Sequence, residues 1–453
     1  MKRERSMQYM KRKKRFSLSL SRVIVLAILG VILMGTVLLM LPISSRSGEI
    51  TDFNTALFTA TSASCVTGLV VVDTLTHWSL FGQIVILLLI QIGGLGFMTF
   101  VSFFAVIMGK NVGLRQRRLI MESSGTMELG GILHLLRRIT LGTLLIESVG
   151  AVLLSFRFCA QMGFLKGVYY AVFHSISAFC NAGFDLMGNF SSLSGYATDV
   201  YVNVVIMALI IIGGIGFLVW SDVCNYGFRF RRYRLHSKIV LVSTAILIVL
   251  GSFFFWLFEK DASLSGFSEW EKVLVSVFQG VTPRTAGFST INNVEMSDAG
   301  TLLTSTLMLI GGSPGSTAGG MKTTTIAVLF IGIIVSATGK KDITMFRRRI
   351  DGESVRQAAA IAFLYFAVTI AFTAVISHIE GSALKETLFE VSSAIGTVGS
   401  TMSFTTTLGT LSRYLIALLM FGGRAGAMTL ALVLAERRRN VESKYPLGKI
   451  LIG

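Results

Sequence analysis

Charged residues are scarce in this chain of 453 residues: they make up 14% of it, against about 25% in an ordinary soluble domain. Proline and cysteine occur four times each, and no two cysteines have the spacing of a metal-binding or redox pair. This composition excludes a disordered chain and a typical cytosolic enzyme. Because no catalytic cluster stands out, we expect no enzyme. The cysteines are expected to act as small hydrophobic residues; they are Cys65, Cys159, Cys180 and Cys224.

Positive charge predominates among the few charged side chains. Lys and Arg number 41 against 24 Asp and Glu, which gives a net charge of +17, while the mean hydropathy is +0.71. A nucleic-acid-binding protein would carry such charge on a hydrophilic surface, whereas here it shares the chain with long apolar runs. We therefore expect an integral membrane protein with no nucleic-acid partner, whose basic segments are attracted to anionic membrane lipids.

Eight apolar runs approach or exceed the roughly 20 residues that a helix needs to cross a bilayer. Alternate connections between them carry 31 Lys and Arg on one side and seven on the other. By the positive-inside rule, the basic segment 1–22 and the tail 437–453 are both predicted to lie in the cytoplasm. The expected runs are 23–42, 78–108, 139–156, 199–220, 238–258, 299–337, 357–378 and 411–435.

An internal fourfold repeat lies in the less basic connections. Four glycines align there, at spacings of 115, 104 and 112 residues. A double glycine follows each one after 25, 30, 24 and 23 residues. The aligned glycines are Gly68, Gly183, Gly287 and Gly399; six positions earlier stand Ser62, Ser177, Val281 and Ser393; the double glycines begin at Gly93, Gly213, Gly311 and Gly422.

The repeat predicts the fold class. We expect an all-α membrane protein with four repeats of outer helix, re-entrant pore helix with a filter loop, and inner helix, arranged around one pseudo-fourfold pore. The segment before each aligned glycine is too short to span the bilayer, so its loop should line a water path that satisfies its backbone. The expected repeats cover 23–109, 137–226, 237–338 and 355–436.

Each aligned glycine ends a triplet of small, polar or β-branched residues. Glycine permits backbone angles that turn successive carbonyls toward one axis, where they can replace the hydration shell of a potassium ion. We therefore predict a selectivity filter, with tight turns in outer loops as the alternative. Its residues are Val66, Thr67, Gly68, Asn181, Ala182, Gly183, Thr285, Ala286, Gly287, Thr397, Val398 and Gly399.

The second long run of the third repeat is interrupted by GGSPGSTAGGMKTTT at 311–325. Such backbone at membrane depth should lie against the water path, below the filter, unless it forms a simple helix kink. Arg424 lies deep in the last apolar run and needs water or a partner. Arg424 is expected either to lie in the ion path or to form an ion pair with a carboxylate such as Asp222. Lys322 either belongs to the interrupted segment or extends to the membrane surface.

Acidic side chains raise two further expectations. Asp73, Asp185 and Glu390 lie near the predicted outer mouth, where they either concentrate cations or are simply solvated. Glu147 lies within an apolar run and requires a partner that the sequence does not identify.

The order of the four repeats, the filter loops and the string VTPRTAGF at 281–288 resemble the Trk/Ktr/HKT superfamily of potassium transporters, and most of all its bacterial KtrB-type membrane subunit. The resemblance covers about 20–440. It implies a homodimer in the bacterial plasma membrane, with cytosolic RCK-domain regulatory subunits that bind ATP or ADP. It also implies potassium as the transported ion and sodium as a candidate activator. This chain is expected to bind no nucleotide, because Gly339-Lys340 lacks the rest of a Walker A pattern.

The same resemblance assigns roles to the interrupted segment and the buried arginine. Segment 311–325 resembles the intramembrane gate loop of these proteins, and Arg424 occupies the place of an arginine that projects into the pore. Gly68 stands where serine accompanies sodium permeation, which favours potassium. The implied gate residues are Gly311, Gly312, Ser313, Gly315, Ser316, Thr317, Gly319, Gly320, Lys322 and Arg424.

The sequence therefore predicts the membrane subunit of a bacterial potassium uptake system, gated by an intramembrane loop and a cytosolic partner. The alternative is a sodium-coupled secondary cation transporter with a midplane site at the broken helix.

Overall fold

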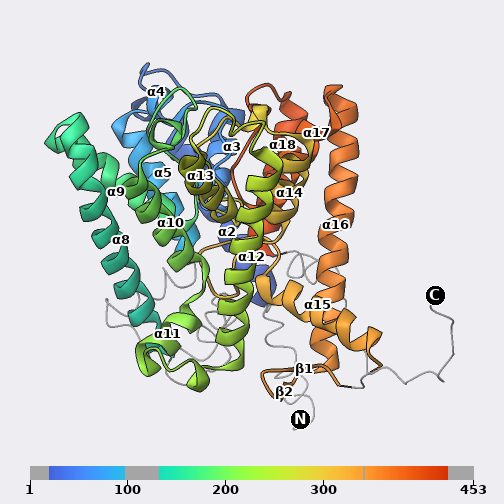
Figure 1. Cartoon of the computed structure of the whole chain (residues 1–453). Helices are drawn as coiled ribbons and strands as arrows, with labels where there is room; N and C mark the ends of the chain where they lie inside the picture. The colour runs from blue at the N-terminus through green and yellow to red at the C-terminus, as the bar shows by residue number, and fades with distance from the viewer. Residues whose placement is uncertain (1–19, 97–131, 340–341, 427–453) are drawn as a thin grey trace, which may run out of the picture.

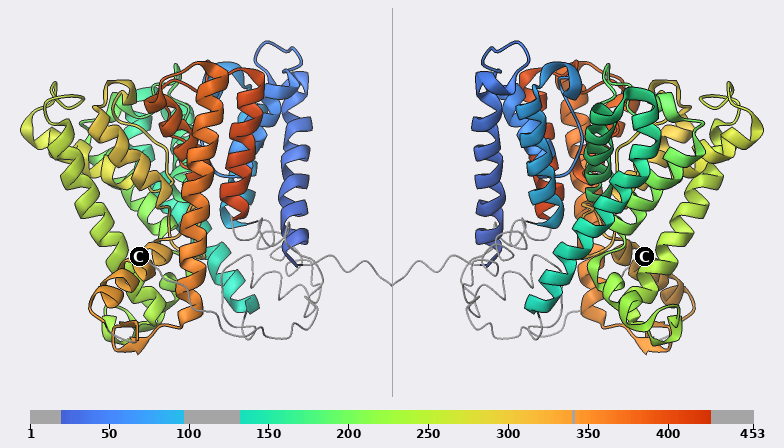
Figure 2. Two further views of the ribbon diagram at one scale, coloured as in Figure 1. Left: turned by 90° about the vertical axis from the view of Figure 1, so that its right-hand side faces the viewer. Right: turned by 90° about the vertical axis from the view of Figure 1, so that its left-hand side faces the viewer.

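The computed structural model describes residues 20–96, 132–339 and 342–426. The segments 1–19, 97–131 and 427–453, and with them parts of the expected runs 78–108 and 411–435, lie outside the described residues. The regular elements in the described part are helices, apart from strands β1 (Thr344–Met345) and β2 (Arg348–Arg349), which pair antiparallel with Thr344 opposite Arg349. The longest helices run along the height of the molecule and are spread around it, and several short ones gather toward one end (Figures 1 and 2).

Four helices in the described part are long and apolar enough to cross a membrane. They are α2 (Leu20–Met40), α8 (Ile132–Met162), α12 (Leu235–Glu259) and α16 (Gly352–Glu380). Large apolar side chains on them face outward: Phe363 is 76% exposed and Val249 is 65% exposed. An outer surface of this kind fits a lipid environment. The expectation of a mostly helical membrane protein is therefore confirmed.

One expected span is not straight. The run 199–220 forms α10 (Val200–Gly214) and α11 (Phe217–Tyr226), which meet at 98°. Gly216 lies at the bend with a φ of 95°, and a Cβ there would come within 2.7 Å of the Pro314 carbonyl. The bend therefore makes room for the segment between α14 and α15. It corrects the expectation of a continuous helix.

A short helix follows each of the four long ones and contacts it, and leads in turn to a further helix. The short helices are α3 (Phe53–Ser64), α9 (Phe164–Cys180), α13 (Glu269–Val281) and α17 (Leu384–Gly396). The helices after them are α5 (Leu80–Leu95), α10, α14 (Asp298–Leu309) with α15 (Thr323–Ala337), and α18 (Thr410–Ala425). Smaller elements are α4 (Thr74–His77), η1 (Pro42–Ser44), η2 (Ser194–Tyr196), η3 (Phe230–Arg232) and η4 (Asn293–Glu295).

Packing between successive groups of helices closes on itself. Each further helix contacts the short helix of the next group: α5 packs on α9, α10 on α13, α14 on α17, and α18 on α3. The last contact joins the end of the described chain to its beginning. Part of each short helix lies in the core, where Phe58, Phe173, Phe278 and Phe389 are at most 1% exposed. Three of them, Phe58, Phe173 and Phe389, stand ten positions before an aligned glycine.

Candidate functional site

The loops that follow the four short helices share an unusual backbone. The aligned glycines have φ angles of 96°, 69°, 79° and 98°. The residue two positions earlier is also left-handed in every loop, although none of the four is a glycine, and a β-branched residue rarely adopts this conformation. Left-handed residues on either side of an ordinary one can turn successive carbonyls toward the same side. The residues two positions earlier are Val66, Asn181, Thr285 and Thr397, with φ of 57°, 58°, 82° and 53°.

Hydrogen bonds to a hydroxyl residue hold the first, second and fourth loops in this shape. The amide of the middle residue donates to the carbonyl of Ser62, Ser177 or Ser393, in each case at 2.8 Å. The hydroxyls of Ser62 and Ser393 accept from the glycine amides at 3.0 Å, and that of Ser177 donates to the Phe184 carbonyl at 2.6 Å. The serines aligned in the sequence thus brace the loops.

The third loop has one residue fewer between its bracing hydroxyl residue and its aligned glycine. Thr282, and not the aligned Val281, donates its hydroxyl to the Phe288 carbonyl at 2.6 Å. The Thr282 carbonyl accepts from Ala286 at 2.9 Å. Val281 stands six positions before Gly287, as the serines stand before their glycines, but the residue that braces this loop is its neighbour Thr282.

The four loops meet in a closed ring. A Cβ added to Gly68 would lie closer than 3.0 Å to the Ala182 carbonyl, which belongs to the next loop. The same relation joins Gly183 to Ala286, Gly287 to Val398, and Gly399 back to Thr67. Only glycine fits at these positions, because any side chain would collide with backbone. All twelve predicted filter residues therefore lie together in one ring of backbone.

The double glycines explain how the helices approach this ring. A Cβ on Gly93, Gly213 or Gly423 would lie closer than 3.0 Å to the carbonyl of Ser64, Phe179 or Ile395, respectively. Each of these carbonyls lies four positions before an aligned glycine. In the third group, Gly311 instead meets the Gly319 carbonyl, because the segment after it turns back on itself.

That segment, residues 310–322, links α14 to α15 without helical structure. Its two ends pair through Ile310 and Met321, and Gly311 donates to the Met321 carbonyl at 2.8 Å. The middle is attached to α10 and α11: Ser313 donates to the Gly214 carbonyl at 3.0 Å, and the Gly315 carbonyl accepts from Phe217 at 2.7 Å. The backbone is therefore satisfied by a folded loop and not by a simple kink.

Polar side chains hold this loop from inside and from α18. Lys322 donates its ammonium group to the carbonyls of Ala318 at 2.8 Å and Gly319 at 3.3 Å, so it binds the loop and does not extend to the membrane surface. Arg424 donates to the carbonyl of Thr317 in the loop and to those of Gly93 and Gly94 on α5. One guanidinium thus joins three elements.

The ion-pair alternative for Arg424 has no counterpart in the described part of the chain. Asp222 instead accepts from the Arg234 amide at 2.9 Å and from the Ser237 hydroxyl at 2.7 Å. The remaining residues predicted to form a gate also lie in the loop: Ser316 donates to the Ser313 carbonyl at 2.7 Å, and Gly319 packs against the side chain of Thr397.

The predicted acidic mouth has a different structure. Glu390 is fully buried and accepts from Thr401 at 2.8 Å and from Thr405. Asp73 caps α4, where it accepts from the Thr76 amide at 2.8 Å. Asp185 is half-buried two residues after Gly183. Glu390 and Asp73 therefore serve local structure.

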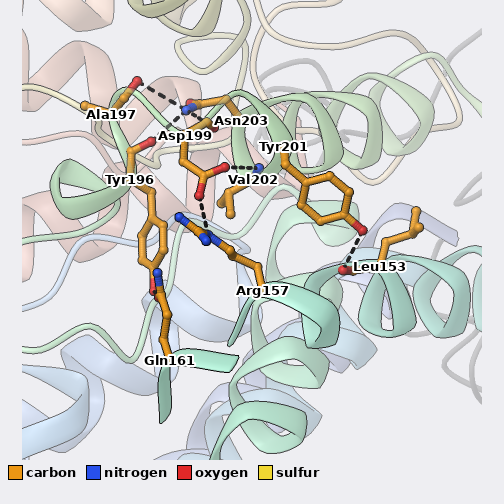
Figure 3. A network of polar contacts seen from close by, with 9 residues as sticks. All are labelled: Leu153, Arg157, Gln161, Tyr196, Ala197, Asp199, Tyr201, Val202 and Asn203. Atoms are coloured by element: carbon orange, nitrogen blue, oxygen red, sulfur yellow. Dashed lines mark hydrogen bonds and ion pairs between the residues drawn. The ribbon is translucent and has the colours of Figure 1, made fainter. Parts of the chain in front are cut away.

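The partner of Glu147 and a second polar cluster could not be predicted from the sequence. Glu147 on α8 accepts from the Gln91 amide on α5 at 3.0 Å, and the Cys180 thiol lies 3.8 Å from its other oxygen. Its partners are uncharged, so charge pairing gave no signal. In the second cluster, Arg157 on α8 binds Asp199 at 2.6 Å, directly before α10 (Figure 3).

Comparison with known proteins relates the chain to cation transporters. Residues 22–443 match the TrkH family, described as a cation transport protein. The potassium/sodium uptake protein NtpJ of Enterococcus hirae is 40% identical over 99% of this chain and 100% of its own length. The Ktr system potassium uptake protein B of Bacillus subtilis is 39% identical over 93% of this chain and 94% of its own. The crystal structure of the potassium transporter TrkH from Vibrio parahaemolyticus has the same fold, with a TM-score of 0.73 at 17% identity, covering 94% of this chain and 87% of that one.

Proposed function

Because the chain belongs to the TrkH family of cation transport proteins, we propose that it is the membrane subunit of a bacterial potassium uptake system. The closed ring of four glycine loops is the observation that carries this proposal. Relatives about 40% identical, named as potassium or potassium/sodium uptake proteins, support the choice of ion. Membership of a transport family confirms the expectation that the chain is not an enzyme.

In this proposal the ring is the selectivity filter of a pseudo-fourfold pore. The carbonyls of the twelve ring residues replace the hydration shell of a potassium ion as it passes. The four short helices end at the ring, so the negative ends of their dipoles add to the attraction for a cation. The sequential contacts of each helix group with the next, from α5 on α9 round to α18 on α3, support a single pore made by one chain.

The gate in this proposal is the loop 310–322 together with Arg424. The loop touches the ring through Gly319 and Thr397, so it lies directly beside the filter. Arg424 holds it to α5 by hydrogen bonds and adds a positive charge that repels a cation. Opening requires the loop to move and Arg424 to release its carbonyls. The glycines of the loop make such a movement less costly.

We further propose a homodimer in the bacterial plasma membrane with both termini in the cytoplasm. Two relatives carry the name of Ktr system potassium uptake protein B, which supports a multi-subunit system. Cytosolic RCK-domain subunits that bind ATP or ADP would then release the gate, and this chain itself would bind no nucleotide.

A second candidate function is a sodium-coupled cation transporter, and the name of the NtpJ relative favours it. Sodium as an activator of the potassium pathway would also fit that name. The two functions differ in energetics, because a passive pathway follows the electrochemical gradient of potassium alone.

Flux through purified protein in liposomes tests the proposal. We expect potassium and rubidium to enter down an imposed gradient in sodium-free buffer and to stop at the Nernst potential. Uptake that proceeds against the potassium gradient when sodium flows inward would favour the coupled transporter instead.

A further inference from the structure

One side chain of the ring reaches into the gate loop. The Asn181 amide nitrogen donates to the Thr317 hydroxyl at 2.8 Å. Asn181 is 1% exposed and Thr317 is fully buried, so water does not compete for this bond. The hydroxyl donates in turn to the Phe179 carbonyl at 3.1 Å. Thr317 therefore bridges the end of α9 and the filter triplet that follows it.

The other three loops lack this link. Val66 occupies the corresponding position in the first loop and has no polar group. The hydroxyls of Thr285 and Thr397, in the third and fourth loops, are buried without a hydrogen-bond partner in the described part of the chain. The second loop is therefore the one in which a filter side chain is bound to the gate loop. An asparagine also tolerates the left-handed φ of 58° better than a β-branched residue does.

The backbone of Thr317 is hydrogen-bonded to groups on α18 and α10, the helices that hold the gate loop. Its carbonyl accepts from Arg424, and its amide donates to the Gly213 carbonyl at 3.3 Å. A gate movement that carries Thr317 away from Arg424 would also carry its hydroxyl away from Asn181. Asn181 would then keep a buried donor without an acceptor, and its strained backbone would lose one of its supports.

We propose that the hydrogen bond between Thr317 and Asn181 makes the selectivity of the filter depend on the state of the gate. This proposal rests on the function proposed above, in which the ring is the filter and loop 310–322 is the gate. Thr317 is a positioning residue: it fixes the second filter loop through Asn181. When the bond is absent, the second loop is free to relax and the carbonyl ring fits potassium less closely than when it is held.

Thr317→Val tests the proposal, because it removes the hydroxyl and keeps the shape of the side chain. We expect the ratio of potassium to sodium flux in liposomes to fall by about threefold or more. Thr317→Ser retains the hydroxyl and should retain the ratio. Ser313→Ala is the matched gate control. The Ser313 hydroxyl contacts the hydroxyl of Thr323, the first residue of α15, at 3.0 Å and does not contact the ring. This variant should raise flux with the ratio unchanged.

A double-mutant cycle separates this coupling from a general loosening. Asn181→Gly tolerates the left-handed backbone and removes the amide, so it should lower the ratio as Thr317→Val does. The double variant should be no worse than either single variant, because both remove one bond. If Thr317→Val does not fold, the proposal is tested by comparing the flux ratio of Asn181→Gly with that of Thr317→Ser.

Failure of the proposed coupling and failure of the filter assignment would give different results. If Gly68→Ser lowers the ratio but Thr317→Val and Asn181→Gly leave it unchanged, or if their effects add, the coupling is wrong and the filter stands. If Gly68→Ser also leaves the ratio unchanged, the filter assignment itself fails.

Discussion

Gly399 packs directly against the carbonyl of Thr67, and this contact joins the last of the four glycine loops to the first. Without it, the other three contacts would form an open row of loops. With it, each loop meets two neighbours and the backbone surrounds one axis. The ring therefore needs all four units, which explains why the aligned glycines recur along the whole chain.

Gly68→Ser is predicted to impair ion selectivity. Gly68 has a φ of 96°, and a Cβ would collide with the Ala182 carbonyl of the next loop, so the ring must widen. We expect the ratio of potassium to sodium permeability to fall by about fivefold or more, measured as flux in liposomes. Gly48→Ser is the matched control, because Gly48 also has a positive φ, of 73°, but a Cβ there would meet no atom within 4 Å. An equal effect in both variants would contradict the filter.

Arg424→Ala is predicted to raise potassium flux in the absence of a regulatory partner. The substitution removes the bonds to Thr317 and Gly93 and also the charge that repels cations. We expect an increase of roughly threefold to tenfold, the effect of lowering a barrier by about 0.7–1.4 kcal/mol. Arg413→Ala, on the same helix but bound to the Thr406 carbonyl, should have little effect.

Arg424→Lys separates the two contributions of this residue. Lysine keeps the charge but loses the forked donors. Flux close to that of the unmodified protein would show that charge holds the gate, and flux close to that of Arg424→Ala would show that the hydrogen bonds do. A fall in flux in both variants would contradict the proposal that Arg424 holds the gate closed.

Glu147 is predicted to stabilise the protein as a hydrogen-bonding group. Its side chain binds Gln91, and its described partners carry no positive charge, so Glu147→Gln should be tolerated. Glu147→Leu leaves the half-buried Gln91 amide without its acceptor and should cost about 1–3 kcal/mol. Thermal unfolding in detergent measures the difference, with the exposed Ser148→Ala as control. Equal losses for Gln and Leu would show that the charge itself is required.

The position of Asp185, two residues after Gly183, predicts that cation uptake depends on pH. Burial raises the pKa of this carboxyl, which lies in the loop after Gly183, to about 6, opposed by a hydrogen bond from the Met187 amide and assisted by nearby Asp73. The carboxyl is therefore charged above pH 6, where it attracts cations, and neutral below it. Rubidium uptake at limiting concentration should fall between about pH 7 and pH 5.

Asp185→Asn should give low uptake across this range and remove the pH dependence. Asp52→Asn is the control, since Asp52 is exposed and caps α3. An unchanged pH profile in Asp185→Asn would assign the dependence to another group.

Much of this site follows from sequence because it is built from backbone. Glycine is required where a Cβ would collide with the neighbouring backbone, so the ring and the helix contacts left a regular spacing of glycines in the sequence. The break before α15 was likewise visible in its composition. Hydropathy similarly identified the long helices.

Side-chain contacts between distant segments left no such pattern. The missing residue in the third loop moved the brace to Thr282, which only a structure can reveal. The bond from Asn181 to Thr317 and that from Gln91 to Glu147 join side chains that lie far apart in the chain and do not form a pair of opposite charges. The bend between α10 and α11 depends on what packs beside Gly216, not on the apolar run itself.

The position of a bound ion tests the central claim most directly. A structure of the purified protein with rubidium, located by its anomalous scattering, should show an ion on the axis of the ring, surrounded by the carbonyls of Thr67, Ala182, Ala286 and Val398. Sodium in place of rubidium should bind there less fully. Rubidium bound instead beside the broken helix at 310–322, with the ring empty, would contradict the filter and favour the coupled transporter.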